Sequence, residues 1–204
     1  MSKIVLASQS PRRKQLLSQL GLPFQVVPSL VNEEADIVAP VALVEELAER
    51  KAREVSTRFP NDLVIGADTI VAFGSEILGK PESFNHAVEL LNKLSGNWHE
   101  VYTGVALRIQ QNEEHQVQSR VFHQVTRVKF SELSPAEIDH YVRSGSPMDK
   151  AGAYGIQDDW GAVFVERIEG DYYNVVGFPL HRFYQELKTF APHYLELKKM
   201  ELDV

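Results

Sequence analysis

The chain has 204 residues, enough for one domain or two small lobes around a sizeable hydrophobic core. A hydrophobic fraction of 44% and a charged fraction of 24% are typical of a soluble globular protein, and the formal net charge of −7 argues against broad binding to nucleic acid or an anionic membrane. The absence of cysteine excludes disulfides and thiolate metal sites. No apolar run is long enough for a signal peptide or a membrane span, so we expect a cytoplasmic protein.

The first segment predicts a buried strand at Ile4–Ala7 followed directly by the start of a helix. Ser10 is a good N-cap, Pro11 is a good first helical residue, and Gly21 ends the helix. Basic residues at 12–14 (Arg-Arg-Lys) are unusual there, because a helix N-terminus already carries partial positive charge. Together with the free backbone N–H groups they suit a polyphosphate, and a solvated basic helix end is the alternative.

The next stretch predicts a second strand at Phe24–Val27, an acidic loop at 32–36 and a long amphipathic helix over Pro40–Phe59. Lys51 falls at the edge of the apolar face of this helix. Its side chain has two interpretations, which the sequence leaves open. It lies along the surface with its ammonium group in water, or it reaches into a site beneath the helix.

The segment Leu63–Phe73 predicts a central strand, because it is apolar on both faces. Asp68 stands in its middle, where a carboxylate is costly unless it is paired, hydrogen-bonded or metal-bound. Gly66 and Ala67 leave room for a ligand near the backbone. We therefore interpret Asp68 as a functional residue, with a structural carboxylate bound to neighbouring backbone N–H groups as the alternative.

The middle of the chain predicts a tight turn at 79–81 that projects Lys80, followed by a helix that ends at Leu94. The segments Trp98–Gln110 and Val117–Phe130 predict antiparallel scaffold strands on either side of a polar turn at 111–114.

The C-terminal third begins with a capping box, Ser134 to Glu137, that starts a helix. Pro147–Gln157 has neither helical nor strand periodicity and is interpreted as a ligand-reading loop or an irregular structural connection. Segments 162–165 and 172–176 predict a β-hairpin, and a last amphipathic helix starts at Pro179.

The alternation of helices and strands indicates a mixed α/β architecture. Five blocks then stand in order along the chain: Ser8 to Arg13, Gly66 to Thr69, Leu78 to Pro81, Leu94 to Gly96, and Met148 to Gln157. This series resembles the Maf family of nucleoside triphosphate pyrophosphatases, most of all the branch acting on dTTP and UTP. The resemblance implies a mixed twisted sheet flanked by helices with a central cleft, as in inosine triphosphatase-like proteins. It implies a single domain over 1–191, with two lobes left open, and a tail over 192–204.

The resemblance also implies a reaction, in which water attacks the α-phosphorus and releases a nucleoside monophosphate and pyrophosphate. The chemistry requires a divalent metal, expected to be Mg²⁺ or Mn²⁺ because the candidate ligands are oxygens. Asp68 is the expected proton acceptor or metal ligand, and Glu33 matches an acidic metal-site position, although Asn32 stands where an acid is common in relatives. The expected substrate-binding residues are Ser8, Ser10, Arg12, Arg13, Lys51, Thr69, Lys80, Asp149 and Gln157.

Base selection falls, by the same resemblance, on Arg12, Thr69 and Gln157. An amide offers both an acceptor and a donor, so Gln157 can face N3–H and O4 of uracil or thymine, and it can also be reversed for cytosine. The stretch 158–161 (Asp-Asp-Trp-Gly) replaces a shorter Gly-rich link common in relatives, and Trp160 either stacks on the base or packs in the protein.

Alternatives stay open at this point. They are a pyrophosphatase for 7-methyl-GTP or another non-canonical nucleotide, a phosphatase that releases orthophosphate, and a non-catalytic nucleotide-binding regulator of septum formation. The expected partner is a nucleoside triphosphate, without nucleic acid or membrane, and a homodimer is left open.

Overall fold

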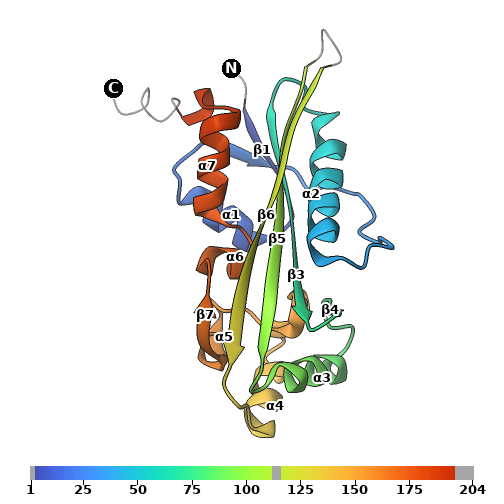
Figure 1. Ribbon diagram of the computed structural model, residues 1–204, viewed down its shortest axis with the longest axis vertical. Helices are drawn as coiled ribbons and strands as arrows, with labels where there is room; N and C mark the ends of the chain where they lie inside the picture. The colour runs from blue at the N-terminus through green and yellow to red at the C-terminus, as the bar shows by residue number, and fades with distance from the viewer. Residues whose placement is uncertain (1–2, 112–115, 196–204) are drawn as a thin grey trace. The chain divides into compact units, whose positions relative to one another are not determined.

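The computed structural model describes residues 3–111 and 116–195, and the chain forms two compact units (Figure 1). Unit 1 contains Met1–Asp68, Thr103–Gln124 and Gly177–Val204, and unit 2 contains Thr69–Tyr102 and Val125–Val176. The elements in chain order are β1 (Ile4–Ala7), α1 (Pro11–Ser18), β2 (Phe24–Val26), α2 (Pro40–Ser56), β3 (Leu63–Phe73), β4 (Glu76–Leu78), α3 (Phe84–Leu94), β5 (Trp98–Gln110), β6 (Val117–Phe130), α4 (Pro135–Arg143), the 3₁₀ turns η1 (Ser146–Asp149) and η2 (Ala151–Ala153), α5 (Asp159–Phe164), β7 (Val165–Glu169), α6 (Tyr172–Val176) and α7 (Leu180–Phe190).

Over the described residues the strands form a seven-stranded mixed sheet with the order β2-β1-β3-β5-β6-β7, and β4 pairs with β3 away from this path. Strand β1 runs parallel to both β2 and β3, whereas β4 and β7 form antiparallel pairs with β3 and β6. The predicted mixed α/β fold with a helix-flanked sheet is therefore confirmed, while the central cleft stays a prediction.

The core of unit 1 places α2 on one side of its strands and α1 and α7 on the other (Figure 1). Small residues make the α2 side unusually close, because Ala48 and Ala52 of α2 pack against Val5, Val64 and Ala106 of the strands. Gly66 sets the closest approach, since a Cβ there would stand 2.1 Å from the carbonyl oxygen of Ala48. The helix backbone therefore rests almost directly on β3.

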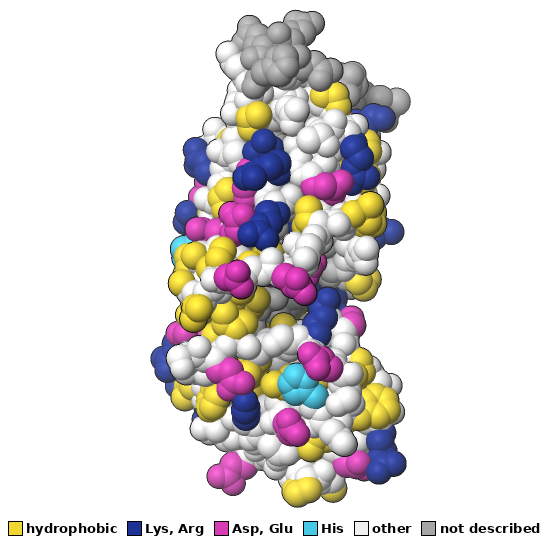
Figure 2. Space-filling model, turned by 90° about the vertical axis from the view of Figure 1, so that its right-hand side faces the viewer, with side chains coloured by type: hydrophobic (Ala, Val, Ile, Leu, Met, Phe, Trp, Pro, Cys, Tyr) yellow, Lys and Arg dark blue, Asp and Glu magenta, His cyan; other side chains and the backbone are white. Residues whose placement is uncertain are grey.

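The outward face of α2 carries alternating charges that pair along the helix. Arg50 bonds Glu46 and Arg58 bonds Glu54, each one helical turn apart. Figure 2 shows that acidic and basic side chains are interspersed on this side of the molecule rather than gathered into a field of one sign.

The core of unit 2 is aromatic, with edge-to-face contacts that join Phe130, Tyr154, Phe164 and Tyr141. His99 is buried among them, and its Nε2 lies 2.7 Å from the Tyr154 hydroxyl. Burial lowers the pKa of His99 to about 3, so the ring is neutral at physiological pH.

Local signals at helix starts are confirmed by the structure. The Ser10 side chain accepts a hydrogen bond from the Arg13 backbone N–H, and Ser134 and Glu137 form the predicted capping box. Strands β1 and β3 have the predicted bounds, whereas the helix predicted to reach Phe59 ends at Ser56. The predicted turn at 111–114 and tail at 192–204 lie mostly outside the described residues.

The predicted C-terminal hairpin is wrong. Residues 159–164 form the short helix α5, and Val165–Glu169 pairs with β6 rather than with the segment that follows. That segment is the helix α6, because Asp171 Oδ1 accepts the Tyr173 N–H and so caps a helical turn. Asn174 also holds α6 in place, donating to the Val101 carbonyl and the Thr126 hydroxyl. These bonds override the strand preference of the aromatic and β-branched side chains.

Candidate active site

A buried ion pair joins the middle of the central strand to α2. Because side chains alternate along a strand, Val64, Gly66 and Asp68 share the face of β3 that α2 covers. Lys51 projects from the buried face of α2, and its Nζ lies 2.7 Å from Asp68 Oδ1. The close approach that Gly66 permits therefore carries the ammonium group to the carboxylate. Of the two interpretations of Lys51, the one in which it reaches beneath the helix is observed.

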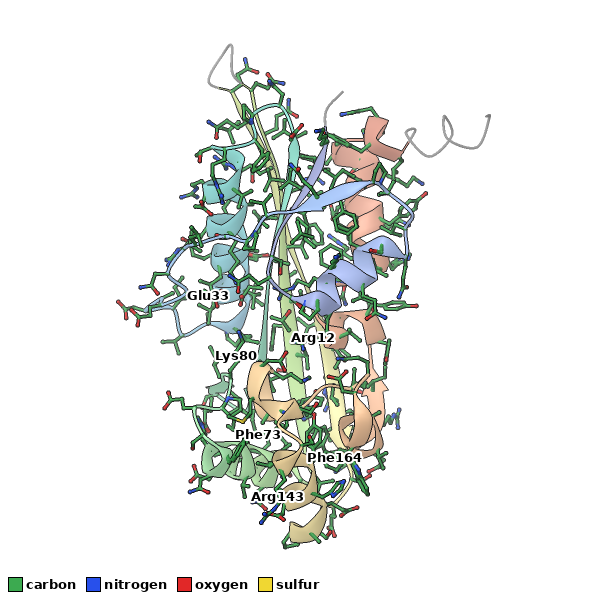
Figure 3. All side chains as sticks on the ribbon, turned by 180° about the vertical axis from the view of Figure 1, so that it is seen from behind. Arg12, Glu33, Phe73, Lys80, Arg143 and Phe164 are labelled. Carbon is green, nitrogen blue, oxygen red and sulfur yellow. The ribbon has the colours of Figure 1, made fainter. Side chains whose placement is uncertain are left out.

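Glu33 supplies a second carboxylate to the same lysine. It lies on the loop before α2 (Figure 3), and its Oε1 stands 2.8 Å from Lys51 Nζ. The loop is shaped by Asn32, whose Oδ1 accepts the Glu34 backbone N–H and whose amide donates to the Glu34 side chain. Two carboxylates from segments distant in sequence thus converge on one ammonium nitrogen.

The start of α1 adds hydroxyls and cations to unit 1. Arg13 donates to the Gly177 carbonyl over 3.0 Å and to the buried Ser8 hydroxyl over 3.3 Å. Burial lowers the pKa of Arg13, and the neighbouring Asp68 carboxylate opposes that shift while Arg12 adds to it. The acid of the central strand and the basic helix start are therefore electrostatic neighbours, as the sequence predicts. Figure 3 shows Arg12 at this helix start.

Unit 2 carries the remaining sequence-predicted residues. Lys80 is exposed on the turn after β4, and this turn is bonded to the loop of residues 147–157 because the Gly152 N–H donates to the Gly79 carbonyl. Thr69 follows Asp68 on β3 and is partly buried. The Gln157 amide is buried, and neither Nε2 nor Oε1 has a hydrogen-bond partner within the described part of the chain.

The sequence analysis did not identify the contact between Lys150 of this loop and Asp158, which follows it. Lys150 is buried, with its Nζ 2.7 Å from Asp149 Oδ1 and 3.0 Å from Asp158 Oδ2. The sequence does show a lysine with acids on either side of it in an irregular, glycine-containing loop. It does not show which of these acids the lysine contacts. Trp160 packs edge-on against His140 of α4 and is 38% exposed, which favours the packing interpretation.

Among the described residues, no helix combines the length and apolar composition needed to cross a membrane.

The chain is closely similar to proteins named dTTP/UTP pyrophosphatase. It is 48% identical to the one from Lachnoclostridium phytofermentans, over 94% of this chain and 96% of that protein. It is 51% identical to the one from Symbiobacterium thermophilum, over 94% of this chain and 95% of that protein. The solved structure of the Staphylococcus aureus Ham1 protein matches with a TM-score of 0.40 and 16% identity, over 63% of this chain and 72% of that chain.

A family model described as Maf-like protein matches residues 3–190, nearly all of the chain that the structure describes. With relatives this similar over almost their whole length, the chain belongs to the Maf family.

Proposed function

We propose that this protein is a nucleoside triphosphate pyrophosphatase that hydrolyses dTTP and UTP to the monophosphate and pyrophosphate. The observation that carries the proposal is the buried Asp68 carboxylate on the central strand, paired with Lys51 and next to the basic start of α1. Relatives named dTTP/UTP pyrophosphatase support the choice of substrate.

Asp68 is proposed to accept a proton from the attacking water. The water oxygen bonds to the α-phosphorus, the bond from that phosphorus to the bridging oxygen breaks, and pyrophosphate leaves with the electron pair. Lys51 donates a hydrogen bond to Asp68, which fixes the carboxylate orientation before substrate arrives.

The triphosphate is assigned to the cationic residues Arg12, Arg13, Lys51 and Lys80. Arginine and lysine neutralise phosphate oxygens, and the backbone N–H groups that begin α1 add hydrogen-bond donors. Ser8 and Ser10 contribute hydroxyls at the same helix start. Asp149 stays in the proposal as a substrate-binding residue, although its carboxylate bonds Lys150 in this structure.

Glu33 and Asp68 would hold a divalent cation, Mg²⁺ or Mn²⁺. These residues fit such an ion because their two carboxylates converge on one point, which the Lys51 ammonium nitrogen occupies in this structure. Within the described residues there is no group of three or more His, Cys, Asp or Glu side chains suited to a metal. Two carboxylates fit Mg²⁺, which commonly takes its other ligands from phosphate oxygens and water. Such an ion supplies charge neutralisation on the phosphates when bound.

The base is assigned to Gln157, with Arg12 and Thr69 as further selecting residues. A buried amide with no partner among the described residues has both its donor and its acceptor available for a ligand. A pyrimidine with N3–H and O4 offers the complementary pair. The proposal further places the enzyme in the cytoplasm, without nucleic acid or membrane as a partner, and leaves a homodimer open.

The test is a panel of canonical and modified nucleotides with Mg²⁺ or Mn²⁺, assayed for pyrophosphate and orthophosphate. Pyrophosphate and monophosphate from dTTP and UTP are expected. Preferential turnover of 7-methyl-GTP would identify that nucleotide as the substrate in place of dTTP and UTP. Orthophosphate as the first product would indicate a phosphatase. Nucleotide binding with no product under any metal condition would favour a non-catalytic regulator.

A further inference from the structure

Lys150 is a buried cation held by both ends of one loop. Besides Asp149 and Asp158, its ammonium group donates to the Ser146 carbonyl and lies 3.4 Å from the Ser146 hydroxyl. Burial pulls the pKa of Lys150 down, but the two carboxylates outweigh it and the pKa is raised. The ammonium group therefore stays charged at physiological pH and links the beginning of the loop, at Ser146, to Asp158.

Asp158 closes the turn that carries Gln157. The Asp158 N–H donates to the Gly155 carbonyl over 3.1 Å, and the Asp158 carbonyl accepts the Ala162 N–H of α5. At the other end of the turn, the Gly155 N–H donates to the Tyr141 hydroxyl over 3.3 Å. Gln157 thus sits between two anchored residues.

The ion pair lies directly beneath this turn. A Cβ at Gly155 would stand 2.7 Å from Asp158 Oδ2 and 2.8 Å from Lys150 Cε. The turn backbone therefore rests on the Lys150–Asp158 contact, and a shift of the ion pair shifts the turn.

The Gln157 amide needs such support. A buried donor and a buried acceptor without partners each cost free energy, so the side chain would gain by turning toward water or toward a nearby polar group. Neither amide atom has a partner among the described residues, so hydrogen bonds of its own do not hold it there. The backbone position of the turn must hold it instead.

We propose that Lys150 and Asp158 form a clamp that positions the Gln157 amide for reading the nucleotide base. The inference rests on the proposed function, because it assumes that Gln157 contacts a base. Lys150 and Asp158 are positioning residues: they act on the ligand through the turn.

The main test compares Asp158→Asn with wild type. Asparagine keeps the shape and removes the charge, so the clamp weakens while the fold remains. For dTTP and UTP we expect KM to rise about tenfold with kcat changed less than about twofold, and the preference over CTP to narrow. Asp158→Glu, which restores the charge, is expected to recover most of the lost selectivity.

Two controls separate positioning from general destabilisation. Asp139→Asn breaks an exposed ion pair with Arg143 on α4 of the same unit and should change neither KM nor selectivity. Nuclear magnetic resonance of the Gln157 side-chain NH₂, assigned with Gln157→Ala, reports on the amide without any substrate. Asp158→Asn should shift or broaden that signal, and Asp139→Asn should not.

Unchanged KM, selectivity and amide signal in Asp158→Asn would overturn the clamp. So would an equal fall in kcat for every nucleotide together with a lowered melting temperature, since that is the signature of a purely structural residue. If the wild type releases no pyrophosphate from any nucleotide, the proposed function fails. The amide signal still decides whether Lys150 and Asp158 hold Gln157.

Discussion

In each unit of this protein a lysine is buried between two carboxylates, yet the two clusters are built differently. In unit 1, Lys51 lies on a long helix, and its partner Asp68, a side chain only 10% exposed, lies on the central strand. In unit 2, Lys150 lies between two 3₁₀ turns, and its partners Asp149 and Asp158 are 58% and 31% exposed. In unit 1 a helix and a strand hold the lysine and one of its carboxylates, and only Glu33 comes from a loop, whereas in unit 2 one irregular segment carries the lysine and both acids.

The difference separates two uses of a buried ion pair. A carboxylate that is held rigidly by a strand and a helix is suited to chemistry, because its orientation is set before the substrate binds. An ion pair inside a loop is suited to shaping that loop, because it supplies the order that regular hydrogen bonding does not. Unit 1 is therefore expected to respond to substitution in turnover, and unit 2 in selectivity.

The largest expected effect is on turnover, in Asp68→Asn. Loss of the proposed proton acceptor should lower pyrophosphate release about 10³-fold. Circular dichroism should still show the wild-type fold, because Lys51 keeps its contact with Glu33. The control Glu54→Gln removes a carboxylate of α2 that pairs with Arg58 at the surface and should retain activity. Near-normal pyrophosphate release by Asp68→Asn would reject the catalytic role and erase the contrast between the units.

The next prediction concerns the unfolding free energy when Lys51, the buried lysine of unit 1, is replaced. Lys51→Met leaves Asp68 without its buried cation. Because removing one partner of a buried ion pair is costly, we expect the unfolding free energy to fall by about 3–5 kcal/mol. Urea unfolding without metal measures this loss. Mg²⁺ should raise the melting temperature of Lys51→Met more than that of wild type, since a divalent cation replaces the lost charge. Lys93→Met, which breaks an exposed pair with Glu76, should lose less than about 1 kcal/mol. An equal response of wild type and Lys51→Met to Mg²⁺ would contradict the shared position of lysine and metal.

Gly66 lies against the helix that carries Lys51, and Gly155 lies against Lys150 and Asp158, so alanine substitutions at these two glycines can be compared directly. In Gly66→Ala the new methyl meets backbone, 2.1 Å from the Ala48 carbonyl oxygen, and we expect a loss of about 3 kcal/mol in unfolding free energy. In Gly155→Ala it meets the side-chain ends of Lys150 and Asp158, which can shift, and we expect about 1 kcal/mol. Urea midpoints in the reverse order would show that the helix and strand of unit 1 are the more adaptable pair.

The last prediction concerns His99, a histidine buried in unit 2. His99 of unit 2 bonds the Tyr154 hydroxyl, and burial lowers its pKa to about 3. Its unfolded pKa is about 6.5, so as the pH falls below 6.5 the unfolded chain takes up a proton that the folded chain refuses, and stability is lost. Relative to His99→Gln, wild type should lose about 1.6 kcal/mol between pH 6.5 and pH 5. Parallel stability curves for the two proteins would mean that the pKa of His99 is nearly the same in the folded and the unfolded chain.

Local chemistry made much of the fold predictable. The caps at Ser10 and Ser134 and the apolar run of β3 act over a few residues, so their elements follow from nearby sequence alone. The C-terminal hairpin was predicted wrongly for the opposite reason. Asn174 holds α6 through Val101 and Thr126, and partners so distant in sequence leave no local trace.

The sequence by itself determined that an isolated carboxylate lies in a buried strand and that cations gather at a capped helix start, because periodicity and capping are short-range properties. Only the tertiary structure decided that Lys51 turns inward to join Asp68 with Glu33, and that Lys150 meets Asp158 beneath the Gln157 turn. The physical reason is reach: a long lysine side chain has many acids within its range, and the packing of backbone against backbone at Gly66 and the anchored turn at Gly155 select one of them.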